Sequence, residues 1–399
     1  MNHWNTVELG SVCEVVRGGS PRPIIDYLTE ESDGLNWLKI GDVKENDKYF
    51  LHANEKIKPS GISKTREVKV GDLILSNSMS FGRAFITLID GYIHDGWLRL
   101  RCDENKLDKE YLYYFLTSNL AQHQFKAVAT GSVVNNLKSD TVKAVKISLP
   151  SLEEQKKIAK VLTLFDNKIK CNTEINENLE QQIGTILLKT IDNANTQSVK
   201  LGDYLYIKGR IGWKGLKKSE YLPISDYRII NGESLTLSGI DWNKAGYISA
   251  ERYEESPEIM LNIGDILLSK DGTIGKIGYV DKLETPSSVA SGIFVIRNTR
   301  QAEISTQFIY YLLKSRLFKA FITSRTEGSV IPHLYQKDFM EFEFQLPSPD
   351  DMKIFDDTTA AMFSMVFSNL NENERLIHLR DSLLPKLMSG EINVSDLDI

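Results

Sequence analysis

One stretch of the chain constrains its fold more than any other. Between Ser151 and Ile191 there is no proline, and apolar residues recur in alternating steps of four and three. This spacing is typical of a helix that packs along a single stripe. The apolar positions are Ile158, Leu162, Phe165, Ile169, Leu179, Ile183 and Ile186. Asn172 and Asn176 occupy the same stripe, and a buried Asn there lowers stability but specifies the register of the pair.

The same pattern occurs again 197 residues later, with Asn369 and Asn373 in place of the first two asparagines. The apolar positions of this second copy are Met362, Val366, Leu376 and Leu383. We therefore expect two long helices that pack on each other, each roughly 60 Å long at 1.5 Å per residue. The alternative is two amphipathic helices that each cover only their own domain.

The rest of the chain is also repeated, which indicates two domains of one fold. Four pairs of segments match, with offsets that drift only from 192 to 197 residues: 9–10 with 201–202, 70–76 with 263–269, 110–116 with 307–313, and 130–134 with 327–331. We expect recognition-type domains at 1–150 and 199–347, long helices at 151–192 and 348–392, a linker at 193–198 and a tail at 393–399, of which Val394–Ile399 are acidic and frayed.

Each half is predicted to be an α+β domain with a mixed or strongly curved sheet. Short apolar runs bounded by turn residues predict strands. They are 37–40, 72–76, 84–89, 98–101 and 146–149 in the first half, and 265–269, 276–280, 292–297 and 342–346 in the second. One helix is expected at Glu110–Leu120 and another at Gln307–Phe318. Ser151 with Glu154 is a capping box that should start the first long helix.

Composition limits the class of protein. The 399 residues are 41% hydrophobic and 26% charged, as in ordinary globular proteins, and no apolar run approaches the length of a membrane span. The start of the chain has no basic and apolar signal-peptide pattern. Three scattered cysteines, without a C-x-x-C pair, fit a cytoplasmic protein without disulfides or a zinc site. The net charge of −6 counts mildly against nucleic-acid binding, although local charge matters more.

Catalytic motifs are missing from the sequence. There is no P-loop, no H-E-x-x-H helix and no G-x-S-x-G elbow, and the six histidines are isolated from one another. E-x-K triplets at 67–69 and 154–156 resemble those of restriction-type nucleases, but triplets of this kind are expected by chance in so charged a chain. The sequence therefore favours a binding protein over an enzyme.

Several loops carry residue types that contact nucleic acid. The glycines of the 272–278 hairpin form either a plain tight turn or a DNA-facing loop that presents Lys270 and Lys276. Two Gly-Ser-Val segments, at 131–133 and 328–330, are followed by short polar side chains or by a histidine. Asn reads adenine, whereas Arg and Lys read guanine and phosphate. The candidate DNA contacts are Arg83, Asn135, Asn136, Lys270, Lys276 and His333, with Arg210 and Lys214 on phosphates.

Together these features resemble the specificity subunit of Type I restriction–modification enzymes. The matching motifs are GDILLSKDGTIGKIG at 264–278, the Gly-Ser-Val segments, Leu-Pro before each long helix and LRDSLLPKLMSGEI at 379–392. Two departures exist: the first half has Ser-Asn-Ser-Met-Ser at 76–80, and the second helix lacks the Glu-Glu-Gln found at 153–155. Neither changes the repeat or the helix stripe.

The resemblance implies a subunit with no catalysis and no cofactor of its own. Each half would be a target recognition domain that reads half of a bipartite double-stranded DNA site. The helices would form an antiparallel coiled coil with pseudo-twofold symmetry that sets the spacing. They would dock two methyltransferase (M) subunits, which use S-adenosylmethionine. Restriction/translocase (R) subunits, which use ATP and Mg²⁺, would join them.

Three alternatives remain. In place of an active specificity subunit, the chain would be a stand-alone DNA-binding regulator or inhibitor, an inactive specificity subunit, or a nuclease that uses Glu67 and Lys69.

Overall fold

The computed structural model describes residues 4–44, 47–78, 82–129, 136–192, 198–210, 215–326 and 333–394. The chain divides into two compact units, one of Met1–Cys171 with Glu372–Ile399 and the other of Asn172–Asn371. Each unit therefore contains one globular half together with a part of both long helices.

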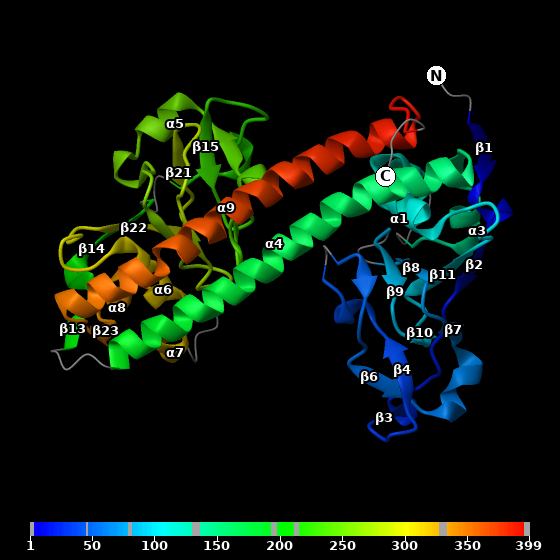
Figure 1. Cartoon of the computed structure of the whole chain (residues 1–399), viewed down its shortest axis with the longest axis horizontal. Helices are drawn as coiled ribbons and strands as arrows, with labels where there is room; N and C mark the ends of the chain where they lie inside the picture. Colours follow the sequence, from blue (N-terminus) through cyan, green and yellow to red (C-terminus); the bar gives the residue numbers. More distant parts are fainter. Residues whose placement is uncertain are drawn as a thin grey trace. The chain divides into compact units, whose positions relative to one another are not determined.

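The two long helices are present and pack on each other (Figure 1). Helix α4 spans Leu152–Asp192 and helix α9 spans Pro349–Met388. The predicted capping box is confirmed, because Glu154 N donates to Ser151 Oγ while Glu154 Oε2 accepts from Ser151 N. In the first unit Arg380 pairs with Asp166 and Asn373 bonds to Ile169, so the helices run antiparallel there.

The asparagines of the stripe bond across the helix pair. Asn176 Nδ2 donates to Val366 O at 3.0 Å, and Asn369 Nδ2 donates to Asn176 Oδ1 at 2.8 Å. Asn373 Nδ2 donates to Ile169 O at 3.4 Å. Asn172 is buried like Asn176. The apolar stripe residues are buried or half-buried: Phe165, Ile169, Leu179, Met362, Val366 and Leu376.

Removal of one partner from this polar layer is expected to cost more than removal of both. Asn176→Ala leaves the half-buried amide of Asn369 without this acceptor, which should lower the free energy of unfolding by about 1–3 kcal/mol. The double variant Asn176→Leu with Asn369→Leu replaces both groups by apolar ones and should cost less than the single change. Urea denaturation of the two variants measures the difference. Equal losses would contradict a coupled Asn176–Asn369 pair.

The long helices also cover the cores of the globular halves. Ile158 and Leu162 of α4 pack in the core of the first unit, and Ile183 and Leu187 of the same helix pack in that of the second. The two arrangements considered from the sequence are therefore combined in one structure, since a single helix pairs with its partner and closes a domain core.

The first unit contains a short ladder and two larger sheets. The ladder pairs β1 (Asn5–Glu8) with β12 (Lys146–Leu149). One sheet has the order β2 (Cys13–Arg17), β11 (Trp97–Cys102), β8 (Leu73–Ser76), β9 (Ala84–Thr87) and β5 (Tyr49–Phe50). The other has the order β3 (Leu28–Thr29), β6 (Glu55–Ile57), β4 (Leu35–Leu38), β10 (Gly91–Ile93) and β7 (Arg66–Val68).

The second unit repeats this plan with fewer strands among the residues described. Its ladder pairs β13 (Ser198–Lys200) with β23 (Glu343–Gln345). Its main sheet has the order β14 (Leu205–Gly209), β22 (Ile293–Asn298), β19 (Ile266–Ser269) and β20 (Ile277–Tyr279). A second sheet has the order β18 (Gly246–Ile248), β15 (Tyr227–Ile230) and β21 (Ser287–Val289), and β16 (Leu235–Thr236) pairs with β17 (Gly239–Ile240).

The two halves therefore share one topology, and the predicted α+β repeat is confirmed. The order β2-β11-β8-β9 recurs as β14-β22-β19-β20, and the parallel pair β4–β10 recurs as β15–β21. A bidentate ion pair recurs as well, formed by Arg101 with Asp72 in one half and by Arg297 with Asp265 in the other. Both sheets of the first unit and the β18-β15-β21 sheet are mixed, whereas the β14-β22-β19-β20 sheet is antiparallel throughout.

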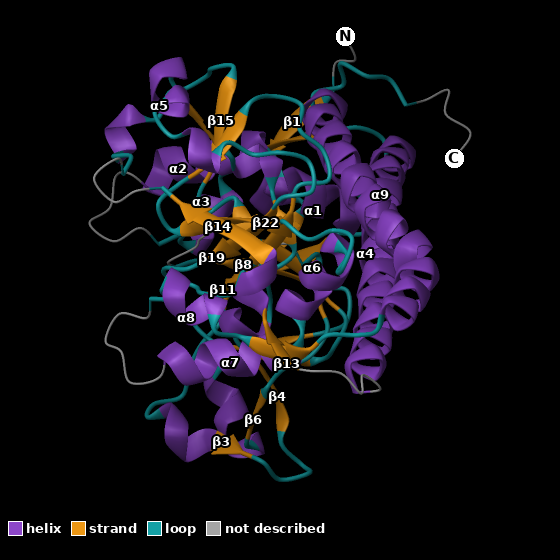
Figure 2. Ribbon diagram, turned by 90° about the vertical axis from the view of Figure 1, so that its left-hand side faces the viewer, coloured by secondary structure: helices purple, strands orange, loops and turns teal. Residues whose placement is uncertain are grey.

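The prediction of a single helix after the sheet in each half is wrong, because two helices occupy that segment in each half. They are α1 (Lys109–Thr117) and α2 (Asn119–Ala129), and α6 (Thr306–Lys314) and α7 (Arg316–Thr326). Ser118 and Ser315, at the breaks, have extended backbones, and their hydroxyls bond back to the last turn of the preceding helix. Figure 2 shows α1 and α6 between the strands of their own domains and the long helices.

The frayed tail was expected to begin at Val394, but Val394 is 1% exposed and packs in the core of the first unit, because its side chain is apolar. Among the residues described, no helix is long and apolar enough to cross a membrane. The remaining short helices are α3 (Ser139–Lys143), α5 (Ala250–Glu254) and α8 (Gln336–Met340).

Candidate nucleic-acid interface

Five of the eight candidate DNA contacts lie at one hairpin in each unit: Arg83, Asn136, Lys270, Lys276 and His333. The loop between β8 and β9 runs from Ser76 to Arg83, and the loop between β19 and β20 has the same length, from Ser269 to Lys276. Ser76 Oγ accepts from Arg83 N at 3.0 Å, and Ser269 Oγ accepts from Lys276 N at 2.8 Å. The ends of the two loops are therefore held by the same hydrogen bond, which places Arg83 and Lys276 at equivalent positions.

Two other segments are attached to each hairpin by matching backbone hydrogen bonds. In the first unit Asn77 N donates to Gly96 O at 2.9 Å, and Leu137 N donates to Asn77 O at 2.8 Å. We call residues 76–78, 82–83, 94–96 and 136–137 the first loop cluster. It brings together segments that lie up to 60 residues apart in the chain.

The second unit has the same arrangement. Lys270 N donates to Gly292 O at 2.9 Å, and Leu334 N donates to Lys270 O at 3.0 Å. We call residues 269–276, 290–292 and 333–334 the second loop cluster. Asn136 and His333, each just before the bonded leucine, occupy equivalent positions in the two clusters.

The two clusters share a backbone but carry different side chains. Arg83 corresponds to Lys276, Asn136 to His333, and Asn77 to Lys270. These pairs differ in the number and geometry of their hydrogen-bond donors and acceptors. A common framework with different polar groups suits two sites that recognise two different ligands of one chemical kind.

Side chains of the second loop cluster are held in place by their neighbours. The His333 ring is hydrogen-bonded to Asp271 through Nδ1, and Lys270 Nζ lies 3.6 Å from Asp271 Oδ2. Lys276 Nζ donates to Gly232 O at 2.7 Å. These contacts fix the direction of each polar group, which is a requirement for selective hydrogen bonding.

In the first loop cluster Arg83 is partly buried and lies over the ring of Phe85, with its guanidinium carbon 5.2 Å from the ring centroid. Its Nε and Nη2 atoms are buried and have no hydrogen-bond partner in the part of the chain that the structure describes. Asn136 is exposed. Asn135 and Lys214, the other candidates, lie outside the described residues.

Asp95 is a member of this cluster that sequence reasoning missed. Its Oδ1 accepts from Ser20 Oγ at 2.8 Å, and Arg22 Nη2 lies 3.5 Å from Oδ2. Burial alone would raise the pKa of Asp95, but the hydrogen bonds from Ser20 and from its own backbone N–H, together with the charge of Arg17, lower it. The carboxylate is thus an ionised acceptor. The sequence held no motif around Asp95 that could have identified it.

The backbone near Asp95 explains one glycine. Gly18 N donates to Trp97 O at 2.9 Å, and a Cβ atom on Gly18 would lie 2.1 Å from His94 O. Only glycine allows the 18–22 segment, with Ser20 and Arg22, to approach this closely.

Burial lowers the pKa of His94, whose Nδ1 accepts from Gly96 N at 2.9 Å, so this ring is neutral at pH 7.

Arg210 does not face solvent in this structure. It is 3% exposed, and its guanidinium donates to Val289 O and Ser288 Oγ. Burial and the charge of Arg252 lower the pKa of Arg210. The predicted role of Arg210 as a phosphate contact does not fit this burial, because its donors already bond protein atoms inside the second unit.

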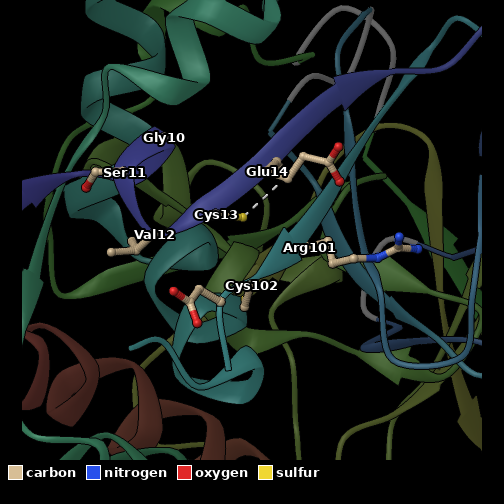
Figure 3. A pocket seen from close by; sticks show the side chains of 8 residues that line it. Gly10, Ser11, Val12, Cys13, Glu14, Arg101 and Cys102 are labelled. Carbon is tan, nitrogen blue, oxygen red and sulfur yellow. Dashed lines mark hydrogen bonds between the residues drawn. The ribbon is translucent and has the colours of Figure 1, made fainter. Parts of the chain in front are cut away.

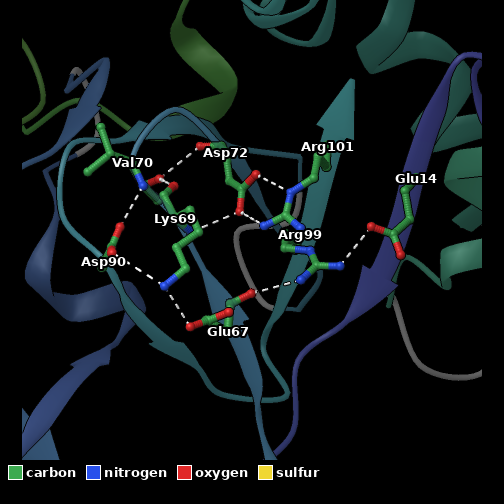
Figure 4. Close-up of polar contacts among 9 residues, drawn as sticks. Glu14, Glu67, Lys69, Val70, Asp72, Asp90, Arg99 and Arg101 are labelled. Carbon is green, nitrogen blue, oxygen red and sulfur yellow. Dashed lines mark hydrogen bonds and ion pairs between the residues drawn. The ribbon is translucent and has the colours of Figure 1, made fainter. Parts of the chain in front are cut away.

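The E-x-K triplet of the first half is part of a surface ion-pair network (Figure 4). Lys69 Nζ lies 2.7 Å from Glu67 Oε1 and 3.4 Å from Asp90 Oδ2. In the other triplet, Glu154 is occupied by the Ser151 cap. Within the described ranges, no three His, Cys, Asp or Glu side chains are placed to share a metal ion.

A hollow at the start of β2 is lined by residues 10–14 and 101–103 (Figure 3). Cys13 and Cys102 lie opposite each other on β2 and β11. Hydrogen bonding to Cys102, together with burial, raises the pKa of Cys13, so this thiol is not an activated nucleophile. Cys13 is therefore not prepared for nucleophilic chemistry, and the loop clusters are the better candidate interface.

The fold and its loops define a class of protein: two copies of one α+β domain, each presenting a polar loop cluster, joined by a pair of long helices. The family described as Type I restriction modification DNA specificity domain matches residues 1–181 and 193–376. The chain therefore belongs to this family. Its role is DNA sequence specificity, carried by two recognition domains in tandem.

Relatives are similar along nearly the whole chain. The Type I restriction enzyme MjaVIII specificity subunit of Methanocaldococcus jannaschii is 23% identical over 99% of this chain and 94% of its own length. The HindI specificity subunit of Haemophilus influenzae is 23% identical over 98% and 100%. The crystal structure of a Type I restriction-modification system S subunit from M. genitalium has a TM-score of 0.56, with 19% identity and 97% coverage of both chains. This last likeness supports the shared fold.

Proposed function

We propose that this chain directs a Type I restriction–modification complex to a bipartite DNA target, with each domain reading one half. The observation that carries the proposal is the pair of loop clusters. The same backbone hydrogen bonds hold Asn77 and Lys270, yet the side chains presented around them differ. Two equivalent surfaces with different donors and acceptors would read two different base sequences.

The side chains support base reading in the major groove. Arg and Lys pair with guanine, Asn pairs with adenine, and a carboxylate accepts from the cytosine amino group. Arg83, Asn136 and the ionised Asp95 would form such contacts in the first half. Lys270, Lys276 and His333 would form them in the second. Arg22, which is highly exposed beside Asp95, would contact phosphate.

The helices would set the distance between the half-sites and dock the partner subunits. A 41-residue helix is about 60 Å long, which exceeds one DNA turn of about 34 Å. Methylation of adenine would be carried out by two methyltransferase subunits with S-adenosylmethionine. Translocation and cleavage would be carried out by restriction subunits with ATP and Mg²⁺. In this proposal the chain itself has no catalytic step and no cofactor, and it acts in the cytoplasm.

The test is a methylome. The chain is expressed with its methyltransferase partner in a host that lacks DNA methylation, and modified adenines are mapped by long-read sequencing. We expect one split motif with a fixed unspecified spacer. Absence of any motif, from a soluble and assembled complex, would overturn the recognition role and favour an inactive subunit or a regulator.

Domain exchange refines this experiment. Replacement of residues 1–150 by the matching domain of a relative should change one half of the motif and leave the other half unaltered. If both halves changed, the assignment of one half-site to each domain would be wrong.

A further inference from the structure

A lysine is buried in the first unit where the recognition domain meets the long helices. Lys48, just before β5, has a side chain that is 8% exposed. Its ammonium lies 2.5 Å from Glu110 Oε2 and donates to Tyr114 Oη at 3.0 Å and to Thr163 Oγ1 at 3.1 Å. Glu110 and Tyr114 belong to α1, whereas Thr163 belongs to α4. Lys48 thus connects the edge of the sheet to both helices.

The contacts continue from Tyr114 onto both long helices. Its hydroxyl donates to Asp166 Oδ2 at 2.5 Å, and Arg380 Nη1 on α9 donates to Asp166 Oδ1 at 2.7 Å. Burial and the charge of Asp166 raise the pKa of Tyr114, so the hydroxyl keeps its proton. We call Lys48, Tyr114, Asp166 and Arg380 the joint network. All four belong to the first unit.

The corresponding place in the second unit is aromatic. The repeat puts Tyr311 at the position of Tyr114 and Phe363 at that of Asp166. Their ring centroids lie 6.0 Å apart, and Tyr279 and Phe367 pack on Phe363 at 5.1 Å and 4.9 Å. The ion pair of Lys314 with Glu180 joins α6 to α4 there, and so connects two elements rather than four.

These two kinds of contact constrain a domain differently. Apolar packing depends on the area that is buried and has little directionality. Charge-assisted hydrogen bonds require particular distances and angles, and in a largely buried site a misaligned pair is costly. The joint network therefore restricts the orientation of the first domain on its helices more narrowly than aromatic contacts would.

We propose that the joint network is a positioning device that sets the orientation of the first recognition domain on α4 and α9, and thereby narrows the range of spacer lengths that the complex accepts. This inference rests on the proposed function, because a spacer exists only if the target is bipartite. Lys48, Tyr114, Asp166 and Arg380 are positioning residues, since they hold the domain and do not read bases.

The test measures spacer tolerance. The full chain, in complex with its methyltransferase, is assayed on DNAs whose spacer is native or is longer or shorter by one base pair. Tyr114→Phe removes only a hydroxyl. We expect methylation at the altered spacers, relative to the native one, to rise about fivefold. Loss of one hydrogen bond, about 1 kcal/mol, changes the equilibrium between two domain orientations by this factor. The bases chosen in each half should stay the same.

Lys48→Met should also raise methylation at the altered spacers, and by more than Tyr114→Phe does. The matched control is Lys146→Met, which removes an equal charge from an ion pair with Glu8 in which both side chains are 57% exposed. An unchanged spacer profile in Tyr114→Phe, or an equal change in Lys146→Met, would overturn the proposal. If Lys48→Met does not assemble, Tyr114→Phe decides alone. Failure of the proposed function is distinguishable, because the unaltered chain would then yield no split motif.

Discussion

Replacement of Asp265 by Asn is expected to lower the free energy of unfolding of the second unit by about 3 kcal/mol, the cost typical of breaking a buried ion pair. The Asp265 side chain is 3% exposed and accepts from Arg297 Nε at 2.7 Å and Nη2 at 3.0 Å. It also accepts from Asn262 N at 2.7 Å. Asn keeps the shape but removes the charge, so Arg297 would be left largely buried without a counterion.

Urea denaturation followed by circular dichroism measures this loss. Glu303→Gln is the matched control, because its pair with Arg300 is about half exposed on both sides and should contribute far less. Asp72→Asn, in the equivalent pair of the first unit, should cost less than Asp265→Asn, since Arg101 is 43% exposed and water can solvate it. If Asp265→Asn and Glu303→Gln were equally destabilising, the Arg297–Asp265 pair would stabilise the second unit no more than a surface ion pair does.

Substitution of Lys276 and His333 by Ala is expected to relax sequence choice in one half of the target only. Each good base contact contributes about 1–3 kcal/mol of discrimination. Their joint removal, about 2–6 kcal/mol, should therefore reduce discrimination at the second half-site by at least about 30-fold. Discrimination at the first half-site, which Arg83 and Asn136 would read, should be unchanged. Methylation rates on DNAs with single base changes in either half provide the measurement.

Lys200→Ala is the control for this experiment. Lys200 lies in the same unit and pairs with Glu341, but it belongs to β13, which is not part of the second loop cluster. It should leave discrimination at both half-sites unaltered. If the double variant weakened binding equally at all sequences and flattened the salt dependence, its side chains would contact phosphates rather than bases.

Periodic patterns made the long helices predictable. Their heptad spacing and the recurring Asn positions depend only on neighbours within one helix, and Asn176 and Asn369 do bond to each other. The repeat likewise predicted that both halves share one α+β topology, because matching patterns of apolar and turn residues favour the same fold. The hairpin at 272–278 was also recognised from its glycines, two of which have a positive φ.

Other features depended on contacts that no local pattern contains. Ser118 and Ser315 break helices that looked continuous, because each hydroxyl competes for the backbone. Arg210 seemed part of a basic strip, yet its guanidinium bonds Val289 and Ser288, almost 80 residues away. Asp95 gains its place only because the 18–22 segment folds against it.

The repeat, the paired helices and the family can be predicted from the chain, since they follow from periodicity and from motifs. The loops that meet, the basic residues that are exposed, and the network of Lys48, Tyr114, Asp166 and Arg380 become known only from the folded molecule. The physical reason is that hydrogen bonds and ion pairs between distant residues depend on how the sheets and helices bring them together. The spacing of residues along the chain does not predict these long-range contacts.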